Sequence, residues 1–77
     1  MKFQTELTDT MGGEANYCWV RRADFELPDN ASGLAIVRRA KAELGITGQR
    51  CKRCDLGETI ELRPYGSCTV AFITPMC

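Results

Sequence analysis

Residues 9–22 read DTMGGEANYCWVRR, which places a glycine pair directly before a segment rich in aromatic and basic residues. Glycine adopts positive φ angles at little steric cost, so Gly12 and Gly13 predict a loop over residues 9–15. The flanking segments have the composition of strands. We therefore expect a hairpin with a long tip, built from a strand over 2–8 and a second strand over 16–27.

Alternation within the first of these segments indicates a half-buried strand, because Phe3, Thr5 and Leu7 fall on one face. Pro28 ends the second strand, since it has no N–H to donate to a ladder. A helix is predicted from about residue 31 to residue 44. Its N-cap candidates are Asp29, Asn30 and Ser32, and Gly45 suits the position just after its C-terminus.

The predicted helix is amphipathic, with Arg38, Arg39 and Glu43 opposite its apolar side. Lys41 lies near the edge of the apolar side, so its ammonium group must extend outward to water. A helix this short is marginal in isolation and must pack on the sheet. The expected apolar face consists of Leu34, Ile36, Val37, Ala40 and Leu44.

Three further strands follow the helix, near residues 49–54, 59–63 and 68–74, with turns at 55–58 and 64–67. Ile60 and Leu62 alternate with polar residues and should point inward. The last strand is the most apolar, so we expect it at the centre of the sheet. The sequence predicts one α+β domain over 1–77: a mostly antiparallel sheet of four to five strands with one helix on one face, in the order ββαβββ.

The charges balance overall, with ten basic and ten acidic residues, but they are unevenly distributed. Residues 1–31 hold three basic and six acidic residues, and residues 32–77 hold seven and four. Such a dipolar surface can steer a partner. The acidic residues of the first part could compete with DNA for a basic groove; they are Glu6, Asp9, Glu14, Asp24, Glu26 and Asp29.

Targeting signals are not expected in this chain. Residues 1–6 are polar and lack the apolar stretch of a signal peptide. The longest apolar run, residues 70–73, is far shorter than the ~20 residues of a membrane helix. Five cysteines, an odd number, fit a reducing compartment better than a disulfide scaffold. We expect a cytoplasmic protein that has no contact with membranes.

Cys51 and Cys54 form a C-x-x-C pair, which could supply half of a zinc site. Histidine is absent, so further ligands would have to be other cysteines. Strand residues three apart point to opposite faces, so the pair could chelate only if a turn begins at Cys51. A redox role would draw on the neighbouring basic side chains, but a turn follows the pair where redox pairs have a helix. We expect two reduced cysteines, one of them buried, and no cofactor.

Catalysis is not expected either. Without histidine the chain lacks the usual base near neutral pH, and a cysteine nucleophile would have no imidazole partner. Gly12 and Gly13 do not belong to a phosphate-binding motif. The sequence therefore favours a non-enzymatic protein.

Two surfaces are candidates for binding a partner. Strict alternation places Tyr17, Trp19 and Arg21 on one strand face and Arg22 on the other, and these residue types dominate binding hot spots. The alternative is that Trp19 anchors the core. The second candidate is the outer helix face around Arg38 and Arg39, which could equally be an ordinary solvated surface.

Nucleic acid could be bound by the basic residues Arg38, Arg39, Arg50, Lys52 and Arg53. No helix-turn-helix, zinc-finger or RNP-like pattern accompanies them, and a net charge of zero argues against strong phosphate binding. Direct nucleic-acid binding is therefore the weaker expectation. A homodimer could form if the strand over Lys2–Thr8 lies at an edge of the sheet.

Residues 9–22, together with the helical segment 34–45, resemble small uncharacterised proteins of tailed phages and prophages. That group brings no established activity and no functional residues. The resemblance implies a small phage protein that inhibits a host defence effector, of the CRISPR–Cas type, by stoichiometric binding in the host bacterial cytoplasm. The partner would be a protein or ribonucleoprotein. The alternatives are a small nucleic-acid-binding accessory protein and a zinc or redox module built on Cys51 and Cys54.

Overall fold

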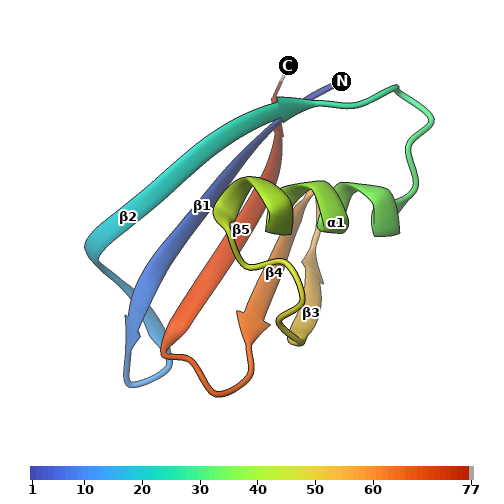
Figure 1. The fold of residues 1–77 in the computed structure, drawn as a ribbon. Coiled ribbons are helices and arrows are strands. Elements are labelled where there is room, and N and C mark those ends of the chain that lie inside the picture. Colours follow the sequence, from blue (N-terminus) through green and yellow to red (C-terminus); the bar gives the residue numbers. More distant parts are fainter. Residues whose placement is uncertain (77) are drawn as a thin grey trace.

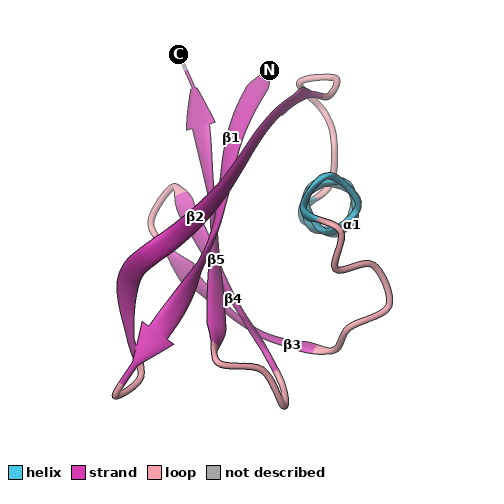
Figure 2. Cartoon of the chain, turned by 60° about the vertical axis from the view of Figure 1, so that its left-hand side comes forward, coloured by secondary structure: helices cyan, strands magenta, loops and turns pink. Residues whose placement is uncertain are grey.

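The computed structural model describes residues 1–76 as a five-stranded sheet with one helix on one face (Figure 1). Along the chain the elements are β1 (Lys2–Met11), β2 (Glu14–Glu26), α1 (Gly33–Leu44), β3 (Cys51–Leu56), β4 (Thr59–Pro64) and β5 (Thr69–Met76). Figure 2 views the helix nearly end-on and shows it on one side of the twisted sheet. The predicted α+β class is confirmed.

The strands lie in the order β2-β1-β5-β4-β3, and every neighbouring pair is antiparallel. β5 occupies the middle, as its apolar composition predicted. β1 lies between β2 and β5, so the expectation that Lys2–Thr8 forms an edge is wrong. The physical reason is that the C-terminal strand returns to pair with β1 from Lys2 to Asp9. The two edges of the sheet are β2 and β3.

The first hairpin has a short turn where a loop over 9–15 was predicted. β1 continues to Met11, and only Gly12 and Gly13 join the strands, with φ angles of 63° and 87°. Two-residue hairpin turns of this kind need positive φ at both residues, which glycine provides. The glycines therefore form the turn as expected, but the residues around them are strand.

The helix is bounded by the capping residues that the sequence offered. Ser32 is the N-cap, and its hydroxyl accepts the N–H of Ala35 at 3.1 Å. Gly45 follows the last turn with φ 74°. Lys41 extends to donate to the carbonyl of Gln49 at 2.6 Å, as its position near the edge required.

The core lies between the helix and one face of the sheet. Phe3 of β1 stacks on Phe25 of β2, with ring centroids 5.3 Å apart. Thr5 is buried beside them, and Leu62 of β4 points inward as predicted. The helix and the segment after it contribute Ala40, Leu44 and Ile46 to the buried cluster, and Ile36 and Val37 pack against it.

Leu34 was predicted to belong to the buried helix face, but it is exposed. It lies about 120° around the helix from Ala40 at 100° per residue, so it falls at the margin of the apolar stripe. The stripe is therefore narrower than the sequence pattern indicated.

Candidate binding surface on the first hairpin

A wide bulge interrupts the pairing of β1 with β2. The register passes from Thr8 opposite Val20 to Thr10 opposite Ala15, so Asp9 alone faces residues 16–19. The Asp9 carboxylate fills this gap, accepting the backbone N–H of Cys18 and the side-chain amide of Asn16, both at 2.9 Å. These hydrogen bonds, first that of Asn16, hold the pKa of Asp9 below its usual value.

Tyr17 sits at the crest of the bulge in a left-handed conformation, with φ 55°. For a bulky residue this region is disfavoured, and such strain persists only where surrounding contacts impose it. Its hydroxyl donates to Oε2 of Glu6 at 3.4 Å. Partial burial, followed by the charge of Glu6, raises the pKa of Tyr17. About half of this side chain is exposed.

The bulge overturns the predicted grouping of Tyr17, Trp19 and Arg21 on one strand face. Arg22 and Tyr17 both reach Glu6, on the face of the sheet away from the helix. Arg21 instead crosses the helix-covered face and donates to the carbonyl of Leu44 at 2.8 Å. The extra residues break the period of two on which strict alternation depends. Arg21 therefore caps the helix C-terminus.

Trp19 does not anchor the core, because 44% of its surface is exposed. Its carbonyl accepts the hydroxyl of Thr8, which is fully buried, at 2.7 Å. The aromatic core position belongs to the stacked phenylalanines. Trp19 is thus held by its backbone, and much of its indole remains open to solvent.

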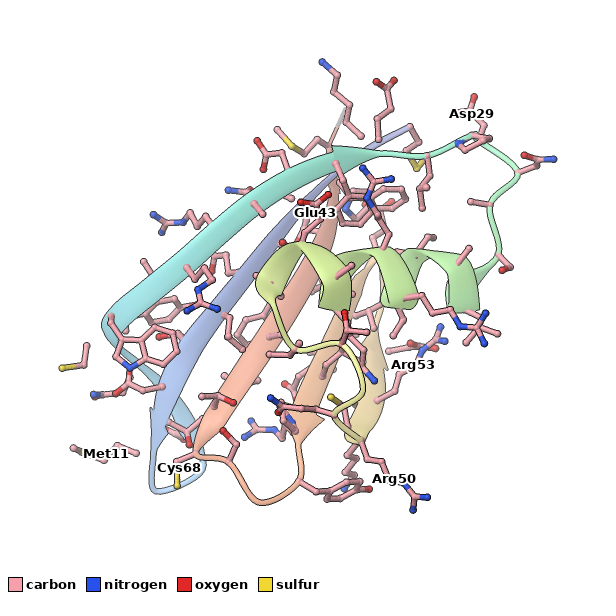
Figure 3. All side chains as sticks on the ribbon, in the orientation of Figure 1. Met11, Asp29, Glu43, Arg50, Arg53 and Cys68 are labelled. Atoms are coloured by element: carbon pink, nitrogen blue, oxygen red, sulfur yellow. The ribbon has the colours of Figure 1, made fainter. Side chains whose placement is uncertain are left out.

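Four large exposed hydrophobic side chains belong to this hairpin. We call them the hairpin surface: Met11, Tyr17, Trp19 and Val20. Met11 is the most exposed of the four and projects away from the hairpin end (Figure 3). The hairpin turn is tied back to the sheet by Arg63 of β4, which donates to the carbonyl of Gly13 at 2.6 Å.

A small recess lies beside Tyr17 on the face away from the helix. Its volume is about 220 Å³. Glu6 and Phe72, which face each other across β1 and β5, line it together with Tyr17. Its other lining residues are polar: Gln4, Thr59 and Thr74. Tyr17 is the residue that the recess shares with the hairpin surface.

Of the two arginines predicted on the outer helix face, one has an ion-pair partner among residues 1–76 and the other has none. Arg39 pairs with Glu43 at 3.0 Å, and its guanidinium lies 5.7 Å from the ring centroid of Phe25. Arg38 is exposed and forms no ion pair with any residue from 1 to 76. A partner contact on this face would depend on Arg38.

Three of the six acidic residues predicted as a surface have structural partners. Glu6 pairs with Arg22 at 3.1 Å, and Asp9 holds the bulge. Asp29 binds the N-terminal ammonium group at 2.9 Å, which lowers the pKa of Asp29. Only Glu14, Asp24 and Glu26 have no side-chain partner within the described residues, and all three lie on β2.

Cys51 and Cys54 lie on the regular strand β3, so no turn begins at Cys51. Cys51 packs against the core while Cys54 is exposed, as expected for opposite strand faces. The condition for chelation by this pair is therefore not met. Within residues 1–76, no three Cys, Asp or Glu side chains are arranged to hold a metal ion.

The bulge is the feature that alternation could not reveal. An aspartate in mid-strand, a residue with low strand propensity, was its one sequence signal.

No helix in the described part of the chain is long and apolar enough to cross a membrane. Comparison of the chain with protein-family models, curated proteins and solved structures finds no match.

Proposed function

We propose that this protein acts without catalysis, as a stoichiometric binding protein whose contact with a protein partner is the hairpin surface. The observation that carries the proposal is the bulge. The side chains of Thr8 and Asp9 hydrogen-bond to the backbone of Trp19 and Cys18. These bonds hold an irregular backbone in which Tyr17 has a positive φ angle and both Tyr17 and Trp19 are exposed to solvent. Strain of this kind is concentrated at functional sites, and exposed aromatics are the usual binding anchors.

The partner in this proposal is a host defence effector of the CRISPR–Cas type, and the site of action is the host cytoplasm. This part rests on the resemblance of residues 9–22 to tailed-phage proteins. Residues 9–22 also contain the bulge and all four residues of the hairpin surface. Binding at an effector surface would block it without any chemical step.

The test is a titration of purified defence effectors with the protein, following both complex formation and effector activity. Inhibition should be complete at a fixed stoichiometric ratio. Trp19→Ala and Tyr17→Ala should each weaken binding by about 10- to 30-fold, as loss of a hot-spot aromatic does. Tyr65→Ala is the matched control, since Tyr65 is also exposed, at 65% against 51% for Tyr17, but lies in the β4–β5 turn. Equal losses in all three variants would argue against the hairpin surface.

A second candidate function, binding to nucleic acid, is favoured by one observation at the other edge of the sheet. Arg50 and Lys52 are exposed beside and on β3 and form no ion pair with any described residue. Arg50 projects away from the sheet (Figure 3). Retention on DNA that falls steeply with salt, and is lost in the variant carrying Arg50→Glu and Lys52→Glu, would support it. Salt-independent capture of a protein would instead support the leading proposal.

A further inference from the structure

Within residues 1–76, β2 is an edge strand, so the backbone groups on its outer side have no strand beside them. Leu27 and Met1 exchange two backbone hydrogen bonds, at 3.0 and 2.8 Å. Because hydrogen-bonded pairs alternate along an antiparallel ladder, residues 25, 23 and 21 also face β1. The even-numbered residues 20, 22, 24 and 26 therefore point their N–H and C=O groups away from the sheet.

This free edge is regular over one window only. It begins after the bulge, which ends at Trp19, and it stops before Leu27 and Pro28, where the chain leaves the sheet. The window spans residues 20–26 and is centred on Ala23. A second strand can pair with it over that length without meeting a proline or a bulge.

The window is complementary to itself in charge. If a second copy pairs antiparallel and uses the whole window, Ala23 faces Ala23 of that copy. Arg22 then faces Asp24 of the second copy, and Asp24 faces its Arg22, both in hydrogen-bonded positions. Asp24 has no partner within the described residues, and Arg22 uses only its Nε on Glu6. Opposite charges directly across strands stabilise pairing.

We propose that two copies of this chain associate through β2, antiparallel and centred on Ala23, so that their sheets become continuous. The occupant of this edge is a second copy because the one symmetric register that fills the window also pairs its charges. The other edge, β3, has only six residues. This pairing does not depend on the proposed function, and it leaves Tyr17 and Trp19 outside the window in each copy.

Sedimentation velocity of the full chain over a range of concentrations tests the proposal. The wild type should show a monomer–dimer equilibrium. Asp24→Arg should raise the dimer dissociation constant by about 10- to 100-fold, because it places arginines opposite each other twice. Glu14→Arg makes the same charge change on β2 outside the window and should leave the constant unchanged.

Two further variants separate pairing from folding. Mixing Asp24→Arg with Arg22→Asp should restore the dimer as a heterodimer, since every cross-strand pair is then of opposite charge. Asp24→Pro removes an outward N–H without touching the β1 ladder, so it should give a folded monomer. The proposal is overturned if the wild type is monomeric at every concentration, if Asp24→Arg or Asp24→Pro dimerises as well as the wild type, or if the mixture of folded variants stays monomeric.

Discussion

Thr8→Val should destabilise the protein more than Thr5→Val, although the two changes are chemically identical. Both threonines are fully buried, and each donates its hydroxyl to a carbonyl of β2. Thr8 donates to Trp19 at 2.7 Å and Thr5 to Ala23 at 2.8 Å. What differs is the number of acceptors, because the Thr8 hydroxyl also lies 3.3 Å from Oδ1 of Asp9, whose carboxylate holds the bulge.

Ala23 lies opposite Thr5 in a hydrogen-bonded pair, so its carbonyl keeps a backbone N–H when the Thr5 hydroxyl is lost. Trp19 and Asp9 border the interrupted register, and the Thr8 hydroxyl lies within reach of both, 2.7 Å from the Trp19 carbonyl and 3.3 Å from Oδ1 of Asp9. A single hydrogen bond contributes about 0.5–1.5 kcal/mol, so losing the contacts with two acceptors costs about 1–3 kcal/mol. The added methyl group offsets about 0.8 kcal/mol of this. Thr8→Val should therefore lose about 1–2 kcal/mol and Thr5→Val about 0–0.5 kcal/mol.

Urea unfolding of the two variants and the wild type measures the difference, and thermal unfolding gives an independent check. For a domain of this size, the loss at Thr8 corresponds to a Tm about 5–15 °C lower. Thr8→Val should also weaken partner binding, because the path of residues 16–19 is no longer fixed. Equal stabilities for the two variants, or a lower stability for Thr5→Val, would refute the idea that the bulge depends on the Thr8 hydroxyl.

Three more predictions concern acid, thiols and the core. Hydrogen bonding lowers the pKa of Asp9 and of Asp29 in the folded protein, so both carboxylates stabilise the fold above their unfolded pKa values, at about pH 4. This stabilisation is lost as the pH falls through the folded pKa values. Asp9→Asn should therefore make the free energy of unfolding fall less steeply below about pH 4, and an unchanged slope would contradict this. Thiol labelling followed by peptide mass spectrometry should modify the exposed Cys54 before the partly buried Cys51, and the reverse order would contradict the assignment of strand faces. Leu44→Ala empties a fully buried site and should cost about 2–5 kcal/mol in urea unfolding, whereas a loss under 1 kcal/mol would mean that the helix does not pack as described.

The parts of the fold that could be predicted from sequence are those set by local patterns. The period of two placed Phe3, Thr5 and Leu7 on one buried face. Capping chemistry offered Ser32 and Gly45 as the ends of the helix, and both are used. These features depend on residues within a few positions of each other, which is why one sequence suffices to predict them.

The candidate site was predicted in composition but not in arrangement. Tyr17 and Trp19, which the sequence singled out as candidate contact residues, are exposed, but the prediction that Tyr17 shares a face with Arg21 was wrong. Alternation assumes an unbroken ladder, and the bulge adds residues to one strand alone. Asp9 can hold the bulge only because the register of β1 and β2 places it opposite residues 16–19, and that register cannot be read from the sequence.

By itself, the sequence determined the types of secondary structure, the glycine turn of the first hairpin, the helix caps and the inward faces of the regular strands. The tertiary structure alone decided that β1 is interior and β2 an edge, and that Arg21 serves the helix while Arg22 serves the far face. It also decided how residues 9–22 present their side chains. The physical reason is range: turns, caps and alternation follow from neighbouring residues, whereas strand order and the bulge depend on pairing between distant segments, which a local pattern does not encode.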